Sequence, residues 1–300
     1  MNDMSAPLSI RPDCPIDGIR LAVLCGVRDA CHAIGVDYLV AGATARDLLL
    51  HHVYGHGIRR RTEDIDIGIA VPDWDAFQRL KDALTEQPGF QLQDTAHALF
   101  YSAVPGGEPL RIDVIPFDGV EDPDGRILWP PSGDTMLSVR GYRAALAEAV
   151  EIQLPAAGIV RSASLPGLAL LKLFAWLDRG RLAPVAKDAL DLVAIVAGYA
   201  DAGQEDRLYA EREELLEMCA FDVPLAGALL LADDVKSITP APLLDSLRQE
   251  LGERSALDRL LDQITLRERL AGRGPDEIVE ARQLRHFWGR LFGVPAEPTP

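Results

Sequence analysis

The spacing of hydrophobic positions changes once along the chain. Over the first half, short apolar runs, helical stretches and Gly/Pro turns follow one another, which predicts strands and helices packed around one sheet. From Ser164 onward the spacing is helical throughout. We therefore expect an α+β protein, with a mixed sheet and flanking helices in a domain at residues 1–155 and an all-helical domain at 156–300. No segment repeats at a fixed period, so a solenoid is not indicated.

The predicted elements follow from this pattern. In the first domain we expect helices at 15–34 and 72–87, and strands at 38–41, 64–69, 89–93, 98–104 and 110–117. Asp73 is the predicted N-cap of the second helix, and the last three strands predict a mostly antiparallel extension of the sheet. The helical domain is predicted to contain helices at 165–177, 183–199, 205–219, 224–236, 240–251, 255–270 and 275–292.

Three aromatic residues allow either packing or contact with a base. Trp129 lies in a loop beside two prolines and could stack on a base, but packing over the sheet is the favoured interpretation. Phe287 and Trp288 lie in a locally basic helix, and aromatic residues at helical spacing more often belong to a core than to a nucleic-acid surface.

Two carboxylates stand two residues apart in the run Asp64-Ile65-Asp66-Ile67. Successive side chains of a strand point to opposite faces, so Asp64 and Asp66 share one face and the isoleucines share the other. Like charges side by side repel, and a purely structural strand gains nothing from this arrangement. A divalent cation removes the penalty, because Mg²⁺ prefers one or two protein carboxylates together with waters and substrate phosphates. The pair therefore indicates a site for Mg²⁺ or Mn²⁺.

A tight turn and a third acid extend this candidate site. The apolar run at 38–41 is followed by Gly42-Ala43-Thr44 and then by a helical stretch, and a glycine at a strand end can bring backbone N–H groups close to a phosphate. A two-metal phosphoryl-transfer site needs a further carboxylate. Asp113 is the best candidate, since it interrupts the apolar run at 110–117. An exposed position on a half-solvated strand remains the alternative for Asp113.

Several segments of the sequence resemble those of a known family. The segments 42–49 (GATARDLL) and 62–67 (TEDIDI) are similar to those of nucleotidyltransferases of the DNA polymerase β superfamily. The later segments 163–172 (ASLPGLALLK), 178–179 (DR) and 187–192 (KDALDL) resemble the AbiEii/AbiGii (MenT-like) branch, the toxin component of type IV toxin–antitoxin pairs. The resemblance covers roughly residues 36–200, and the last hundred residues carry no motif that we can match.

The resemblance implies a polymerase β-like fold, an NTP substrate and transfer of a nucleoside monophosphate to an acceptor hydroxyl with release of pyrophosphate. It implies that the two-carboxylate motif chelates metal, that Lys172 contacts the triphosphate and that Asp188 belongs to the site. It also suggests tRNA 3′ ends as acceptors and a cognate antitoxin as a partner. The candidate residues are Asp64, Asp66, Asp113, Lys172 and Asp188 for catalysis, the first three of these for metal, and Gly42, Ala43, Thr44, Arg46, Thr62 and Lys172 for the nucleotide.

The chain also departs from the superfamily pattern. The usual Gly-Ser or Gly-Gly is Gly42-Ala43 here, so the hydroxyl that often meets a phosphate is missing from that position. Thr44 or Thr62 could replace it. The segment at 42–49 is also similar to poly(A) polymerases and CCA-adding enzymes, which are typically longer and carry further basic RNA-binding regions.

Composition and charge set the remaining bounds. The chain has 300 residues, a net charge of −16 and four cysteines without metal-ligand spacing. No basic, apolar leader and no apolar run of about 20 residues is present, so we expect a cytoplasmic protein without a membrane segment. The three histidines at 51, 52 and 56 lack the spacing of a zinc site.

The acceptor stays open at this stage. The net charge of −16 argues against a broad basic footprint for nucleic acid. Local basic residues nevertheless flank both motifs: Arg59, Arg60, Arg61, Arg179, Arg181 and Lys187. They favour an RNA end narrowly over a small molecule or a protein, although a solvated loop explains Arg59 to Arg61 equally well. A second hypothesis is an inactive, nucleotide-binding regulatory protein.

Overall fold

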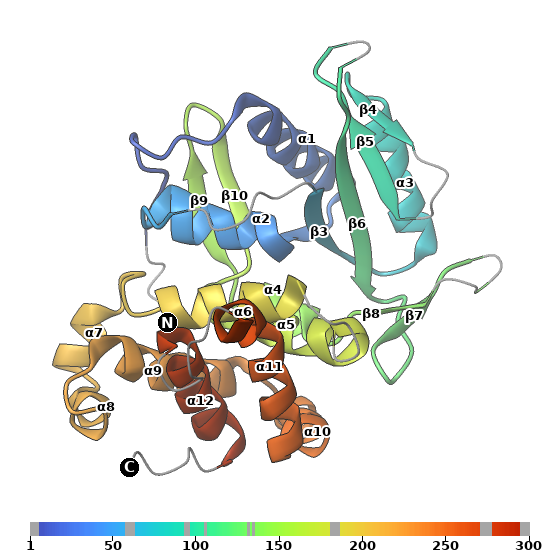
Figure 1. Cartoon of the computed structure of the whole chain (residues 1–300). Coiled ribbons are helices and arrows are strands. Elements are labelled where there is room, and N and C mark those ends of the chain that lie inside the picture. The colour runs from blue at the N-terminus through green and yellow to red at the C-terminus, as the bar shows by residue number, and fades with distance from the viewer. Residues whose placement is uncertain are drawn as a thin grey trace. The chain divides into compact units, whose positions relative to one another are not determined.

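The computed structural model describes residues 6–57, 64–92, 97–104, 107–130, 133, 136–180, 187–270 and 278–294, with no side-chain description at 267–270. The chain divides into two compact units, Met1–Ser164 and Leu165–Pro300. The first unit holds an eight-stranded sheet with helices, and the second is built from helices (Figure 1). The predicted α+β class with a helical C-terminal region is confirmed.

The sheet of the first unit is mixed, with the strand order β1-β9-β10-β2-β3-β6-β5-β4. Its strands are β1 Leu8–Ser9, β2 Asp37–Ala41, β3 Asp64–Val71, β4 Phe90–Leu92, β5 Ala98–Tyr101, β6 Leu110–Asp118, β9 Val150–Leu154 and β10 Gly158–Ser162. A separate two-stranded ribbon consists of β7 Arg126–Leu128 and β8 Met136–Ser138. β3 pairs antiparallel with β2 and parallel with β6, and the β6-β5-β4 extension is antiparallel as predicted.

In the described part of this unit, four α-helices and one π-helix accompany the sheet: α1 Gly18–Ile34, α2 Gly42–Asp47, the π-helix η1 Leu48–Val53, α3 Trp74–Thr85 and α4 Tyr142–Ala147. The carboxylate of Asp73 accepts a hydrogen bond from the backbone N–H of Ala76 (2.7 Å), which confirms the predicted N-cap. α1 and α3 contact each other, and each also contacts strands of the sheet.

The two faces of β3 differ as the alternation predicts. Ile65, Ile67 and Ile69 are fully buried at 0% exposure. Asp64 and Asp66 lie on the opposite face and are half-buried. Burying three isoleucine side chains contributes roughly 5–8 kcal/mol, so the hydrophobic face fixes which side the carboxylates occupy.

Trp129 packs in the interior of the first unit. It is 5% exposed and makes edge-on contacts with the rings of Trp74 and Phe77, whose centroids lie 5.2 and 5.7 Å away. The packing interpretation of this tryptophan is therefore confirmed.

The helical unit contains α5 Leu165–Ala175, the π-helix η2 Trp176–Gly180, α6 Lys187–Gly198, α7 Glu205–Ala210, α8 Glu213–Met218, α9 Val223–Ile238, α10 Ala241–Leu251, α11 Arg254–Leu270 and α12 Val279–Phe292. The single helix predicted at 205–219 is wrong, because the chain turns between α7 and α8. This turn lets both short helices pack on α9 and bury Leu208, Leu215 and Leu216 completely.

Phe287 and Trp288 of α12 belong to the core, as expected. Phe287 and Trp288 are 0% exposed, and Trp288 packs edge-on against Trp176. The indole N–H of Trp176 donates to Gln263 Oε1 (2.7 Å), whose amide donates to the carbonyl of Gly180 (2.9 Å). This chain of hydrogen bonds ties the end of η2 to α11. None of the helices within the described ranges is long and apolar enough to cross a membrane.

Candidate active site

Three carboxylates and one guanidinium group occupy neighbouring positions on one face of β3 and β6. In the parallel ladder, Asp66 is the Cα partner of Asp113, and Asp64 is the partner of Arg111. Register partners and residues two positions apart point to the same face of a sheet. The pairing therefore brings together the three acids that the sequence nominated separately. It also adds Arg111, which the sequence did not nominate.

Gly42 lies directly against the carboxylate of Asp66. The residue has φ +60°, and a Cβ atom placed on it would lie 1.8 Å from Asp66 Oδ2. No other residue type fits there without displacing the carboxylate. Because Gly42 is the first residue of α2, the Asp66 carboxylate lies at the positive end of a helix, which favours its negative charge.

The other predicted nucleotide-binding residues of this segment are buried in α2. Ala43 is 4% exposed, and the Thr44 hydroxyl donates to the backbone carbonyl of Asp64 (3.1 Å), which ties α2 to β3. Arg46 is 5% exposed and donates through Nε and Nη2 to Asp47 Oδ1 (2.9 and 2.6 Å). Thr62 lies outside the described residues, as do Arg59, Arg60 and Arg61.

Asp113 is held by an arginine from its own strand. Arg111 Nε donates to Asp113 Oδ1 at 2.8 Å, and the two side chains are 38% and 16% exposed. His97 stands beside this pair, with its Nε2 atom 4.0 Å from Asp113 Oδ1 and 3.5 Å from Arg111 Nη2. Burial lowers the pKa of His97, although the Asp113 charge opposes that shift. Sequence reasoning missed His97, because it belongs to no recognisable spacing.

The chemistry of this donor set fits a hard divalent cation. Asp64, Asp66 and Asp113 offer carboxylate oxygens on one face, which suit Mg²⁺ or Mn²⁺. Among the residues that the structure describes, no group of three or more His, Cys, Asp or Glu side chains is arranged so that it could hold a metal ion by itself. Mg²⁺ commonly takes one or two protein carboxylates and completes its shell with waters and substrate phosphates, so the set is compatible with an ion bound together with a nucleotide.

A second charged cluster lies within the helical unit. Lys172 of α5 places its Nζ atom 2.9 Å from Asp188 Oδ1 and 2.7 Å from Asp191 Oδ2, both on α6. These three side chains are 9%, 6% and 2% exposed. Arg179 of η2 donates through Nε to Asp188 Oδ2 (2.9 Å) and is itself 70% exposed. Buried charges need partners of opposite sign, and each member of this cluster has one.

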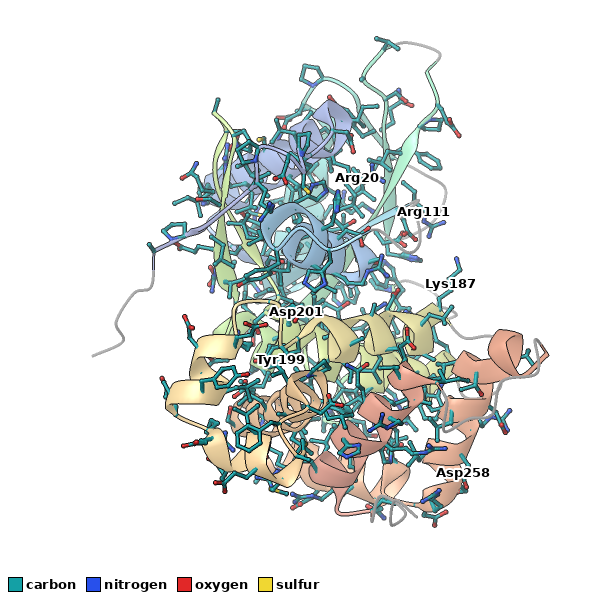
Figure 2. The ribbon with its side chains drawn as sticks, turned by 60° about the vertical axis from the view of Figure 1, so that its left-hand side comes forward. Arg20, Arg111, Lys187, Tyr199, Asp201 and Asp258 are labelled. Atoms are coloured by element: carbon teal, nitrogen blue, oxygen red, sulfur yellow. The ribbon has the colours of Figure 1, made fainter. Side chains whose placement is uncertain are left out.

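Asp188 shows the electrostatic consequence of that pairing. Burial by itself would raise its pKa, but the charges of Lys172 and Arg179 and their hydrogen bonds outweigh burial and hold the pKa below the usual 3.8. Lys187, at the start of α6, is exposed (Figure 2). Arg181 lies outside the described part of the chain.

We expect Gly42→Ala to lower the free energy of unfolding by about 3 kcal/mol, because the new Cβ atom combines a positive φ with overlap of the Asp66 carboxylate. Gly35→Ala is the matched control, since Gly35 has φ +75° and a Cβ atom there would meet nothing within 4 Å. That control should cost only about 1 kcal/mol. Denaturant unfolding of both variants measures the difference, and equal losses would contradict the close approach of Asp66.

We expect Asp188→Asn to lower the free energy of unfolding at pH 7 by about 2–4 kcal/mol, because Lys172 and Arg179 lose an ionised partner. A carboxyl whose folded pKa lies below 3.8 stabilises the protein above that pH, and this stability is lost as the pH falls through the folded pKa. The difference between wild type and variant should therefore shrink below pH 3.8. Asp258, which Figure 2 labels, pairs with Arg254 at the surface, and Asp258→Asn should cost less than about 1 kcal/mol at pH 7.

Comparison with known proteins places this chain among nucleotidyltransferases. Residues 32–266 match the family model described as nucleotidyl transferase AbiEii toxin, type IV TA system. No curated protein matches the chain.

Three solved structures illustrate the similarity at low identity. An antigenic nucleotidyltransferase-like protein from Paracoccidioides brasiliensis is 18% identical, with a TM-score of 0.43, and the match covers 71% of this chain and 94% of that one. ANT(2″)-Ia in complex with adenylyl-2″-tobramycin is 13% identical, with a TM-score of 0.36 and coverage of 67% and 96%. A CCA-adding enzyme with ATP is 16% identical, with a TM-score of 0.25 and coverage of 93% and 80%.

The family match extends over most of the chain and includes both charged clusters. This protein therefore belongs to the AbiEii toxin family of type IV toxin–antitoxin systems and is a nucleotidyltransferase.

Proposed function

We propose that the protein transfers a nucleoside monophosphate from an NTP to an acceptor hydroxyl, with a divalent metal ion and with release of pyrophosphate. The observation that carries this proposal is the register of β3 and β6, which sets Asp66 beside Asp113 and leaves Asp64 on the same face. Phosphoryl transfer depends mostly on positioning and on neutralising phosphate charge, and a carboxylate set on rigid strands serves both needs.

In this proposal Asp64, Asp66 and Asp113 hold Mg²⁺ or Mn²⁺. The bound metal would neutralise phosphate charge and acidify the attacking hydroxyl. Gly42 keeps the backbone close to Asp66. We propose that the turn at 42–44 binds the phosphates of the NTP. Thr44 would contribute its backbone there, since its hydroxyl already donates to the Asp64 carbonyl.

We assign Lys172 to the triphosphate, as the family resemblance implies. The two carboxylates that contact its amine satisfy a charged lysine in a buried position, and they fix the direction of the side chain. Asp188 is then a positioning residue, because it contacts Lys172 and Arg179 together. Asp191 has the same relation to Lys172 and was not among the predicted site residues.

We propose an RNA 3′ end as the acceptor and a cognate antitoxin as a partner, in keeping with the toxin family. Arg179 supports this choice, since most of its side chain is exposed although two of its nitrogen atoms contact Asp188. A small-molecule acceptor is the second candidate, and the net charge of −16 favours it. The presence of all four candidate residues argues against an inactive regulatory protein: Asp64, Asp66, Asp113 and Lys172.

We expect Asp66→Asn to leave the fold intact and to lower kcat/KM at least about 1,000-fold, or ~4 kcal/mol, because the amide cannot supply the charge that holds a divalent ion. Incorporation of labelled nucleotide into purified RNA at matched Mg²⁺ measures the effect, and circular dichroism checks the fold. Asp75→Asn on the exposed side of α3 is the control and should retain full activity. Activity of the Asp66 variant within a few-fold of wild type would contradict the assignment of Asp66 as a metal ligand.

We expect binding of a tRNA 3′ end to weaken with salt along a log–log slope of about −2 to −4, because few cations are available to neutralise phosphates. The measurement is fluorescence anisotropy with a labelled tRNA between low and physiological salt. Two results together would reverse the choice of acceptor. Turnover would not depend on salt, and the four NTPs would label a small metabolite or a protein but not RNA.

A further inference from the structure

The face of β3 and β6 that carries Asp64, Asp66 and Asp113 is called the carboxylate face below. It also carries Arg111, which Figure 2 labels on the α/β unit. Its Cα atom pairs with that of Asp64, its Nε atom donates to Asp113 Oδ1 at 2.8 Å, and Asp113 pairs in turn with Asp66. One guanidinium group thus stands among three acids on two adjacent strands. Such a cation reduces the repulsion that the parallel register imposes on the carboxylates.

The same contact places Arg111 in competition with a metal ion. A divalent cation that binds Asp113 through Oδ1 needs the oxygen atom that Nε of the guanidinium group already contacts. Two cations on one carboxylate also repel each other, and at the edge of a protein this repulsion amounts to a few kcal/mol. Arg111 must therefore leave Asp113 Oδ1 before the metal can bind this oxygen atom.

The exposure of Arg111 makes such a departure feasible. Its side chain is 38% exposed, whereas that of Asp113 is 16% exposed, so the guanidinium group can swing away while the carboxylate stays in place. The His97 ring at 3.5 Å offers no negative charge to receive the arginine, and the register partner of Arg111, Asp64, belongs to the proposed metal set. A nucleotide phosphate would supply that charge, because guanidinium groups bind phosphates well.

We propose that Arg111 is the built-in counter-ion of the carboxylate set. It holds Asp113 in the metal-free protein, competes with the divalent ion and then turns to a phosphate of the incoming nucleotide. This inference rests on the proposed metal site. It assigns Arg111 a positioning role and implies that the metal binds weakly alone and more tightly with the nucleotide.

The test measures metal affinity directly, without turnover. We would titrate the full-length protein with Mn²⁺ by isothermal calorimetry, with and without a non-hydrolysable ATP analogue, in wild type, Arg111→Met and Arg111→Lys. For Arg111→Met we expect Mn²⁺ to bind at least about tenfold more tightly in the absence of nucleotide, because the competing charge is gone. The analogue should then enhance Mn²⁺ binding less than in wild type. Arg111→Lys keeps the charge and should bind Mn²⁺ within a few-fold of wild type.

Arg161→Met is the matched control. Arg161 also lies on a strand of the same sheet and contacts an acid, Asp37, at 2.9 Å. Its loss should leave the Mn²⁺ affinity unchanged. Unchanged or weaker Mn²⁺ binding by Arg111→Met would overturn the counter-ion role while leaving the metal site in place. Equal Mn²⁺ binding by wild type and Asp66→Asn would overturn the metal site itself, and the counter-ion role with it.

Discussion

The parallel pairing of β3 with β6 is the constraint on which the candidate active site depends. It places Asp66 beside Asp113, and a shift of one residue would turn Asp64 and Asp66 into the core and three isoleucines onto the open face. The free energy of burying Ile65, Ile67 and Ile69 therefore fixes the positions of the acids. Two local features offset the resulting repulsion. The start of α2 lies against the Asp66 carboxylate, and Arg111 donates to Asp113.

The helical unit meets a similar electrostatic problem in another way. Lys172 is buried among apolar residues of α5, where a lysine must reach water or meet an anion. Asp188 and Asp191, one turn apart on α6, supply the anions, and Arg179 balances the second negative charge. These four side chains balance one another in charge, whereas the face on β3 and β6 retains more negative than positive groups. An excess of negative charge suits a site that receives a cation, and a balanced cluster suits holding the Lys172 and Arg179 side chains in fixed directions.

Sequence alone predicted those features that depend on local periodicity. The alternation in β3 separated Asp64 and Asp66 from the isoleucines, Asp73 was recognised as an N-cap, and the aromatic residues of α12 were assigned to the core. It could not predict contacts set by strand register. The sequence did not indicate Arg111 as a site residue, because its place in the site depends on its pairing with Asp64 on the neighbouring strand and on its hydrogen bond to Asp113. The close approach of Gly42 to Asp66 likewise joins positions 24 residues apart and appears only when β2 pairs with β3.

The charge of the carboxylate face limits the order in which ligands can bind. Three carboxylates and one guanidinium group leave it negative, and a triphosphate is a polyanion, so a free nucleotide would be repelled. A divalent ion reverses that relation, because it brings positive charge both to the acids and to the phosphates. Under the proposed function, the arrangement therefore favours a nucleotide that arrives with a divalent ion over one that arrives alone. This preference for a metal-bound over a metal-free nucleotide requires no contact with the base, because it follows from the excess of acids on β3 and β6.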